Sequence, residues 1–157
     1  MANESSDSVL GRVPSGIFIL TVGSAETATG MLASWVMQGG FDPPMVTVAV
    51  RQGRFVAQWI TDGAPFNLNV VAEKQFDMLK HFGKGFEPQV PAFEGIDIRH
   101  CARAVPILSN CLGHLECEPV SHLDSGDHRI FLAKIVGGEL RHESPPMVHV
   151  RKRGQNY

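Results

Sequence analysis

The sequence predicts an all-β fold, an antiparallel barrel with two or three short helices, on three observations. Short runs of β-branched and aromatic residues follow one another along the chain, with turns rich in Gly, Pro, Asp and Ser between them. Few segments have the apolar spacing of a helix, which disfavours a parallel sheet covered by helices on both faces. The chain has 157 residues, the length of one domain, so we assign residues 1–157 to a single unit.

In the first third of the chain we expect one helix and three strands. The hydroxyl of Ser6 or Ser8 is expected to cap a short helix that continues through Val13, where Pro14 then stops it. The runs that follow contain mainly β-branched, aromatic and small residues, which predicts strands over residues 16–22, 27–37 and 45–51.

A break between the second and third of these strands is expected at Gly39 and Gly40, and Pro43-Pro44 cannot continue a hydrogen-bonded ladder. Where a ladder is broken, backbone N–H groups become available to a ligand. Ser34, at the end of the preceding apolar run, is small enough for a flat ligand to approach the backbone. The segment therefore has the character of a binding site as well as of a turn.

The rest of the chain is expected to hold two helices and three strands. Apolar residues at helical spacing predict helices over residues 55–60 and 73–82, the second with Phe76, Leu79 and Phe82 as its apolar stripe. A loop with two Gly and two Pro follows over residues 83–93. Strands are predicted over residues 66–71, 108–123 and 128–140, the last two forming a hairpin.

The composition argues against several classes of function. The net charge is −2 and hydrophobic residues make up 43% of the chain, so nothing favours binding to nucleic acid or to an anionic membrane. No apolar run reaches membrane-spanning length, and the polar, acidic N-terminus differs from a secretory signal, so we expect a cytoplasmic protein. The dinucleotide fingerprint Gly-x-Gly-x-x-Gly and the P-loop are both absent from the sequence.

The chain has an odd number of cysteines, and no two of them have the spacing Cys-x-x-Cys; they are Cys101, Cys111 and Cys117. This argues against a disulfide framework and against a zinc site. No pair of histidines or carboxylates has the spacing of a known metal motif, so no metal site is predicted. We expect the cysteines to be buried free thiols in a reducing compartment.

Several motifs, taken in order, resemble those of one family. They are residues 29–50 with Ser-Trp-Val and Gly-Gly-Phe-Asp-Pro-Pro, Asn-Leu-Asn-Val at 67–70, Pro-Ile-Leu at 106–108, Leu-Glu-Cys at 115–117, Gly-Asp-His at 126–128 and the ending at 148–157. Together they resemble the flavin reductase-like family, the FMN-binding split barrels, and most of all the C-terminal reductase domain of cyanobacterial flavodiiron proteins. The resemblance implies a six-stranded antiparallel Greek-key split barrel, usually a homodimer, with FMN in a groove near the subunit interface.

A flavin needs an apolar cleft for its ring, hydrogen bonds for the ring's polar edge and positive groups or N–H donors for its phosphate. Ser34, Trp35 and Val36 are candidates for the ring, through backbone N–H groups as well as side chains; Trp35 could instead be a core or interface aromatic. Arg51 and Arg54 lie between a strand and a helix, a natural anion site, although they could also be solvated surface arginines.

Thr29 could contribute a hydroxyl to the same ligand, and Lys80, at the end of the second predicted helix, could reach the phosphate. The resemblance adds three further candidates. It implies contact of Asn69 with the ribityl chain or the ring, although that side chain could instead tie down a neighbouring loop. It also implies that His128, the candidate catalytic residue, lies near the flavin or the nicotinamide, although it could be structural. His149 is expected to border the ring.

The sequence thus predicts an FMN-dependent NAD(P)H oxidoreductase, in which hydride passes from NADH or NADPH to the flavin and on to free flavin, oxygen or a protein acceptor. FAD is an alternative cofactor. Two other functions stay open: a flavin-binding electron carrier of the flavoredoxin type without a nicotinamide site, and a non-enzymatic split-barrel dimer module. The sequence also leaves open which nicotinamide and acceptor are used, whether the flavin is retained or exchanged, and whether the chain is free-standing or an excised domain.

Overall fold

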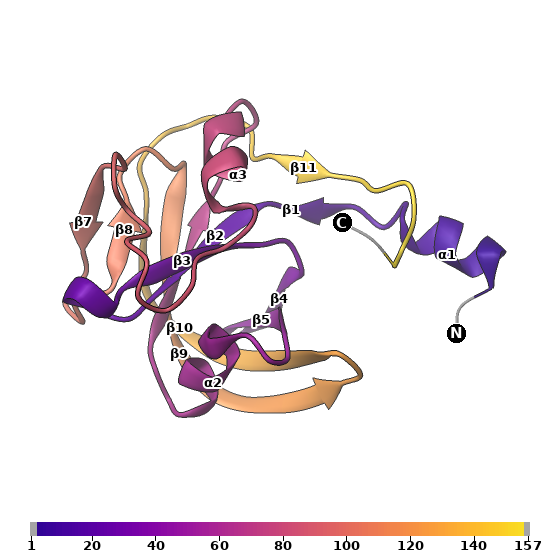
Figure 1. Ribbon diagram of the computed structural model, residues 1–157, viewed down its shortest axis with the longest axis horizontal. Coiled ribbons are helices and arrows are strands. Elements are labelled where there is room, and N and C mark those ends of the chain that lie inside the picture. Colours follow the sequence, from indigo (N-terminus) through magenta and orange to yellow (C-terminus); the bar gives the residue numbers. More distant parts are fainter. Residues whose placement is uncertain (1–2, 156–157) are drawn as a thin grey trace.

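Strands dominate the protein, as the runs of β-branched residues predict. The computed structural model describes residues 3–155 (Figure 1). In that part of the chain the helices are α1 (Glu4–Leu10), α2 (Phe55–Thr61) and α3 (Phe76–Phe82), with a 3-10 turn, η1 (Ala25–Thr27). The strands are β1 (Ser15–Gly16), β2 (Phe18–Val22), β3 (Thr29–Ala33), β4 (Val36–Phe41), β5 (Pro44–Arg51), β6 (Phe66–Val70), β7 (Ile98–His100), β8 (Pro106–Leu108), β9 (Gly113–Ser125), β10 (His128–Leu140) and β11 (Val148–His149).

The main sheet of the described chain curls into an antiparallel barrel whose seven strands follow the order β3-β2-β6-β9-β10-β5-β4. β3 and β4 stand at the two ends of this order, yet they are separated in the chain by Ser34 and Trp35 alone. The two ends of the sheet therefore meet at these residues, which form the split. Taken as two halves of one strand, β3 and β4 leave a six-stranded antiparallel split barrel, and this confirms the predicted fold class.

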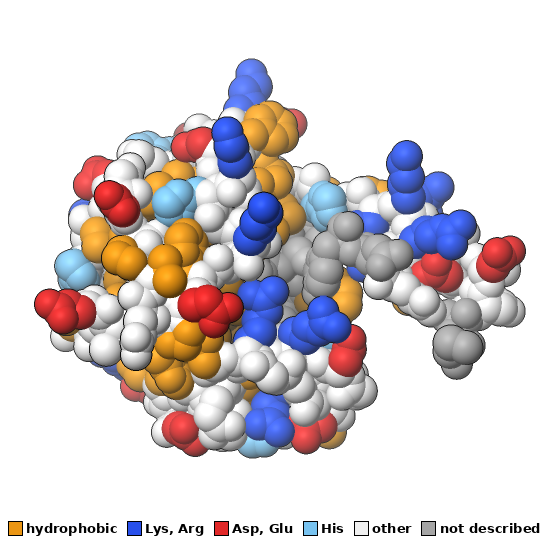
Figure 2. Space-filling model, viewed as in Figure 1, with side chains coloured by type: hydrophobic (Ala, Val, Ile, Leu, Met, Phe, Trp, Pro, Cys, Tyr) orange, Lys and Arg blue, Asp and Glu red, His pale blue; other side chains and the backbone are white. Residues whose placement is uncertain are grey.

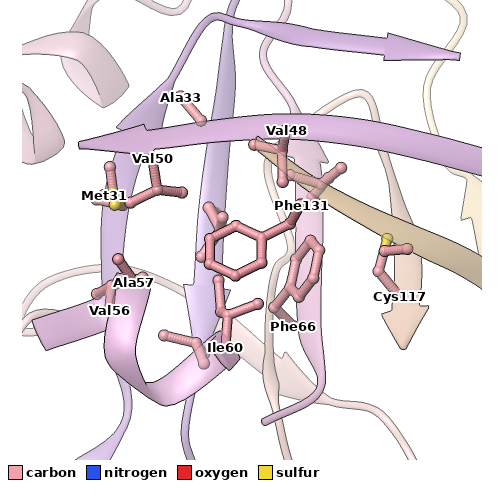
Figure 3. Packing of buried hydrophobic residues seen from close by; sticks show 14 of the residues in the cluster. Met31, Ala33, Val48, Val50, Val56, Ala57, Ile60, Phe66, Cys117 and Phe131 are labelled. Atoms are coloured by element: carbon pink, nitrogen blue, oxygen red, sulfur yellow. The ribbon is translucent and has the colours of Figure 1, made fainter. Parts of the chain in front are cut away.

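The barrel is filled by one apolar cluster, to which the strands contribute alternate residues (Figure 3). Phe66 and Phe131 are fully buried within it. Helix α2 covers one end of the barrel, because Val56 and Ile60 lie on one helical face and belong to the same cluster. Burial of each large apolar side chain contributes about 1.5–3 kcal/mol, so this cluster is the main source of stability.

Helix α3 packs against the outer side of β3. Met78 and Phe82 are buried there, and a Cβ at Gly30 would lie 2.9 Å from the Phe82 ring, so the glycine lets the helix approach the strand. The predicted stripe is partly wrong, because Phe76 is 67% exposed and Met78 takes its place in the core. The helix also begins at Phe76 rather than at residue 73, since residues 73–75 form a turn and the N-cap.

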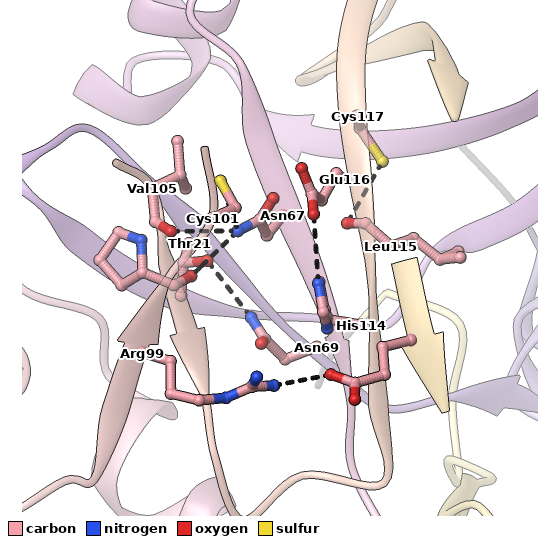
Figure 4. Close-up of polar contacts among 12 residues, drawn as sticks. Thr21, Asn67, Asn69, Arg99, Cys101, Val105, His114, Leu115, Glu116 and Cys117 are labelled. Carbon is pink, nitrogen blue, oxygen red and sulfur yellow. Dashed lines mark hydrogen bonds and ion pairs between the residues drawn. The ribbon is translucent and has the colours of Figure 1, made fainter. Parts of the chain in front are cut away.

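A polar layer separates the outer face of β6 and β9 from the β7–β8 hairpin (Figure 4). Asn67 donates to the carbonyl oxygen of Pro106 at 3.2 Å, and the Asn69 side chain accepts the N–H of Leu108 at 2.9 Å. These bonds fasten the hairpin to the barrel. Ion pairs at its rim join Arg99 to Glu139 and Arg103 to Glu118.

Both described ends of the chain lie in an arm that projects from the barrel (Figure 1). β1 and β11 pair antiparallel in this arm, with Ser15 opposite His149, and α1 lies beyond them. Asp7 of α1 accepts the N–H of Gly154 at 2.8 Å, so the first helix and the C-terminal segment are joined directly.

Helix α1 begins earlier than the predicted caps. Asn3 is its N-cap and accepts the N–H of Ser6 at 2.8 Å, so Ser6 and Ser8 lie within the helix instead of capping it. The helix ends at Leu10 rather than at Val13, and Gly11 is its C-cap. An asparagine side chain caps as well as a serine does, and the choice between neighbouring polar residues was not fixed by local pattern.

Other predicted boundaries also change. The strand predicted over residues 27–37 is interrupted at Ser34 and Trp35, whereas Gly39 and Gly40 lie inside β4, at a bulge where it pairs with β5. The expected break at the glycines is therefore wrong in position. Residues 16–22, predicted as one strand, belong to two strands, β1 and β2. The strand predicted over residues 108–123 is also interrupted, because β8 ends at Leu108 and β9 begins at Gly113. The strands β7 and β11 were not predicted.

Among the described residues, no helix is long and apolar enough to cross a membrane. Residues 3–155 also contain no cluster of His, Cys, Asp and Glu able to hold a metal ion. The three cysteines are free; Cys111 and Cys117 are buried, and burial raises the pKa of both thiols to about 12. Cys101, which was expected to be buried, is partly exposed.

Candidate functional site

A groove runs along the side of the barrel where the sheet splits. It consists of three adjoining hollows of about 330, 170 and 530 Å³. Arg54 lines the first and second, and Trp35 and Arg51 line the second and third, so the hollows lie next to one another. Figure 2 shows Lys and Arg side chains following one another down the middle of the face that it views. An elongated groove with a cationic rim suits a flat ligand that carries an anionic group.

The first hollow, which we call the anion end, holds two positive side chains. Arg54 precedes α2, Lys84 lies in the loop after α3, and both line this hollow. Gly85 makes room for the guanidinium, since a Cβ there would lie 2.9 Å from Arg54 Nη1. The two cations come from segments far apart in the chain, and together they provide the charge that a phosphate requires.

The hydroxyl of Thr29 is the second feature of the anion end. Thr29 begins β3, lines the same hollow and is 2% exposed, and its Oγ1 has no hydrogen-bond partner among the described residues. A buried hydroxyl left unpaired costs about 1–3 kcal/mol, so such groups in proteins usually have a partner. A phosphate oxygen between Thr29, Arg54 and Lys84 would supply that partner, and the residues present therefore fit a phosphorylated ligand.

The middle of the groove lies at the split itself. Strand pairing stops at Ala33 on one side and resumes at Val36 on the other, so Ser34 takes part in no pair of either ladder. The carbonyl oxygen of Trp35 accepts the N–H of Ala49 at 3.0 Å, which keeps the segment anchored to β5. The break that was expected at the glycines is thus present at the residues predicted to contact the ligand ring.

The third hollow, which we call the ring end, contains two aromatic rings. The Trp35 and His128 ring centroids are 4.7 Å apart with the planes tilted by 46°. His128 Nδ1 lies 2.7 Å from Asp127 Oδ1, and the hydrogen bond from His128 holds the pKa of Asp127 below its ordinary value. Gln52 donates to the carbonyl oxygen of His128 at 3.2 Å, so backbone and ring are both held.

Arg151 completes the ring end from the C-terminal side. Its guanidinium carbon is 5.3 Å from the Trp35 ring centroid, within the range of a cation–π contact. Arg151 Nη1 also donates to the carbonyl oxygen of Gly154 at 3.0 Å. Gly154 and Gln155 line the same hollow, so the C-terminal segment forms part of its wall.

The groove gathers six of the ten predicted site residues, namely Thr29, Ser34, Trp35, Arg51, Arg54 and His128. The other four line none of the three hollows. Val36 packs against the barrel core, Lys80 is exposed on α3, and His149 lies in β11. Asn69 is fully buried and donates to the carbonyl oxygen of Ile19 in β2 at 2.9 Å, so its side chain is bound between strands of the barrel.

Lys84 and Arg151 are groove residues that sequence reasoning missed. Lys84 stands between Gly83 and Gly85 in a loop, and a lysine flanked by glycines is a signal that could have found it. Arg151 lies in a basic run, Arg-Lys-Arg, which by itself suggests a solvated surface. No local pattern relates that run to Trp35, which is distant in the chain.

Known proteins resemble this chain both in sequence and in fold. A model of the flavin reductase like domain matches residues 10–157. The chain is similar to diflavin flavoprotein A 1 of Synechocystis sp., with 36% identity over 153 residues. That match covers 96% of this chain and 27% of the relative, so the chain spans about a quarter of the length of the curated relatives it matches.

Solved structures give the same result at the level of the fold. The NADH:FAD oxidoreductase SgcE6 of Streptomyces globisporus C-1027 superposes with a TM-score of 0.85 at 25% identity, and the match covers 96% of this chain and 92% of that one. A second structure of that enzyme, in complex with NAD and FAD fragments, superposes with a TM-score of 0.81 at 26% identity over 94% of this chain and 87% of that one.

Proposed function

Because the chain belongs to the flavin reductase-like family, we propose that it binds FMN in the groove and passes hydride from NADH or NADPH to that flavin. The electrons then go to free flavin, oxygen or a protein acceptor. The observation that carries the proposal is the buried Thr29 hydroxyl, unpaired within the described chain, on a hollow that it shares with Arg54 and Lys84. This anion end matches the single terminal phosphate of FMN, and FAD is the alternative.

The chemistry that a flavin supplies when bound is the acceptance of hydride from a nicotinamide. The chain's own residues bind and orient. Arg54 and Lys84 neutralise the phosphate at the anion end, and the split at Ser34 presents backbone groups to the polar edge of the ring. Trp35 and His128 limit the ring end and exclude water from it.

His128 is the residue that we propose acts nearest to the transfer. Asp127 accepts from its Nδ1 and Gln52 holds its backbone, so the imidazole has a fixed orientation in the ring-end hollow. In this position it orients the nicotinamide or offsets negative charge on the reduced ring. No nucleophile or general base is needed for hydride transfer between two rings.

Titration of the flavin-free protein with FMN, FAD and riboflavin tests the proposal. Arg54→Ala and Lys84→Ala should each weaken FMN by about 1.5–3 kcal/mol, roughly ten- to a hundredfold, because a charge-assisted hydrogen bond is lost. Riboflavin, which has no phosphate, should bind with unchanged affinity. Lys80→Ala on the exposed side of α3 is the matched control and should change neither ligand. Equal losses for FMN and riboflavin would show that the two cations do not meet a phosphate.

The visible spectrum under anaerobic conditions tests the second half of the proposal. Addition of NADH or NADPH should bleach the flavin, and comparing the two donors assigns the nicotinamide. A flavin that binds but is reduced by neither donor would support the electron carrier instead. If the protein binds no flavin, the remaining hypothesis is the non-enzymatic split-barrel dimer module.

A homodimer is part of the proposal, and exposed apolar side chains support it. On β4, Met37 is 69% and Phe41 is 91% exposed, and on the arm Val9, Val13 and Val148 are exposed as well. Exposed apolar side chains of this size favour a contact with another copy of the chain, and a twofold contact is the commonest arrangement. A cytoplasmic location is proposed with it, supported by three cysteines that are all free.

A further inference from the structure

The ring-end hollow has a wall that the barrel does not supply. Arg151, Gly154 and Gln155 line this hollow together with Trp35 and His128. The three residues follow β11 and belong to the arm that projects from the barrel (Figure 1). Something must therefore hold this C-terminal segment, residues 151–155, in place beside the groove.

Asp7 of α1 makes the contacts that hold it. Its side chain is almost wholly buried, and Oδ1 accepts the N–H of Gly154 at 2.8 Å and that of Gln155 at 2.9 Å. A carboxylate taken out of water requires such donors, because burial without them is costly. The N–H of Arg151 also donates to the carbonyl oxygen of Gly11 at 2.9 Å, so the contact extends along the segment.

The two segments also fit closely in shape. A Cβ at Gly154 would overlap the Cβ of Leu10, and a Cβ at Gly11 would lie 2.6 Å from the backbone nitrogen of Arg153. Neither glycine has a positive φ, so close approach of α1 and residues 151–155 is the reason for a missing side chain at both positions.

We propose that α1 is a clasp: Asp7 holds residues 151–155 as the outer wall of the ring-end hollow, and it is thereby a positioning residue for the ring that the groove binds. The inference rests on the proposed function only for the identity of that ring as a flavin. Asp7 lines none of the three hollows; it acts through Arg151, whose guanidinium lies over Trp35. The clasp therefore governs the ring end and not the anion end, where Arg54 and Lys84 lie.

The position of the wall is measurable without any ligand. The chain has two tryptophans, so in a Trp59→Phe background Trp35 is the single tryptophan and can be excited apart from the one tyrosine. Asp7→Ala should raise the acrylamide quenching constant of Trp35 about twofold, because the segment over its ring is released. Glu4→Ala removes an exposed carboxylate from the same helix and should leave quenching unchanged. Asp7→Asn keeps one acceptor oxygen and should give an intermediate value.

Gly154→Ala repeats the test without removing a charge, since its Cβ would push the segment away from Leu10. It should raise quenching as Asp7→Ala does, whereas Gly39→Ala, whose nearest neighbours would be at 3.6 Å, should not. Thermal unfolding of each variant confirms that the barrel is intact. Parental quenching in both Asp7→Ala and Gly154→Ala, with the barrel folded, would overturn the clasp.

Ligand titration then tests positioning. Asp7→Ala should weaken FMN and riboflavin equally, by roughly tenfold, because both carry the ring, whereas Arg54→Ala weakens FMN alone. If quenching rises but both flavins bind with parental affinity, Asp7 does not position the ring and the inference fails. If the parent protein binds no flavin, the proposed function fails, while the quenching result still decides whether α1 holds the segment.

Discussion

At the scale of single residues, Thr29 and Thr21 show how the same side chain can have opposite roles. Both are buried on neighbouring strands. Thr21 Oγ1 donates to the carbonyl oxygen of Pro106, whereas Thr29 Oγ1 is unpaired among the described residues. The first hydroxyl contributes to folding, and the second is the one that we propose a ligand pairs.

The comparison Thr29→Val against Thr21→Val tests this difference. Thr29→Val removes an unsatisfied hydroxyl, so the free energy of unfolding of the flavin-free protein should stay constant or rise by about 1 kcal/mol. Its FMN affinity should fall roughly tenfold. Thr21→Val should instead destabilise the protein by about 1–3 kcal/mol and leave FMN affinity unchanged. Urea denaturation and flavin titration measure the two quantities, and a destabilised Thr29→Val would mean that its hydroxyl already has a partner.

His128→Ala should slow flavin reduction by NADH or NADPH while FMN affinity stays nearly constant. The reason is that we propose His128 to face the nicotinamide, whereas the phosphate is proposed to lie at the anion end, which His128 does not line. Stopped-flow reduction across a range of nicotinamide concentrations separates a change in rate from a change in nicotinamide affinity. Parental behaviour in both would make His128 a structural residue of the turn.

His128→Ala should also change the pKa of Asp127, and this change can be measured without a ligand. The hydrogen bond from His128 lowers the pKa of Asp127, so the stabilisation is present above the ordinary aspartate pKa and is lost as pH falls through the lowered one. In His128→Ala the pKa of Asp127 should return toward its ordinary value. Asp124, whose pKa is lowered by its hydrogen bond from Arg129, is the internal control and should not move. Carbon-detected NMR of the carboxyl groups follows both.

At the scale of elements, the β7–β8 hairpin is held by polar bonds as well as by burial of Ile107 and Leu108. Asn69 joins β6 to both β2 and β8, through Ile19 and Leu108, from a fully buried position. Asn69→Leu should destabilise the protein by about 2–4 kcal/mol, because it leaves a buried N–H and a buried carbonyl without their partner. Asn110→Ala, at an exposed position, should change stability by less than about 0.5 kcal/mol. A small loss in Asn69→Leu would show that the hairpin is held by other contacts.

The strands were predictable because runs of β-branched and aromatic residues favour strand structure. The order of the family-like motifs along the chain then predicted that these strands form a barrel. The face on which a strand residue lies is less accessible to such reasoning. The alternation of side chains along β6 does not tell whether Asn69 points into the barrel or away from it. Only the β7–β8 hairpin, which covers β6, determines that Asn69 is buried in a polar layer. Likewise two glycines look like the natural break, yet the ladder opens at Ser34, where closure of the barrel requires it.

The groove was predictable where its residues are close in the chain, from Thr29 to Arg54. It was not predictable where the chain returns from a distance. Arg151 approaches Trp35 through the pairing of β1 with β11 and through the contact of α1 with the C-terminal segment. Such proximity is a property of tertiary structure, which no spacing along the sequence encodes.

At the scale of the whole molecule, the exposed apolar residues of β4 and the arm lead to a prediction about assembly. Light scattering of the parent protein at micromolar concentration should give the mass of a dimer. The double variant Met37→Asp, Phe41→Asp should give the mass of a monomer, because a charge buried at the contact opposes association. Its thermal unfolding should change little. Val120→Asp, at an exposed apolar position of β9, is the control and should remain a dimer. A monomeric parent protein would contradict the proposal.

The contact of Asp7 with Gly154 has a consequence for how the protein is made. The two residues are 147 positions apart, so the bond can form only after residue 154 has left the ribosome. Closing so long a loop is also slow relative to forming hairpins such as β9–β10. The barrel can therefore assemble first, and one wall of its groove arrives last. During synthesis, the nascent protein would pass through a stage in which the anion end is complete while the ring end is still open to solvent.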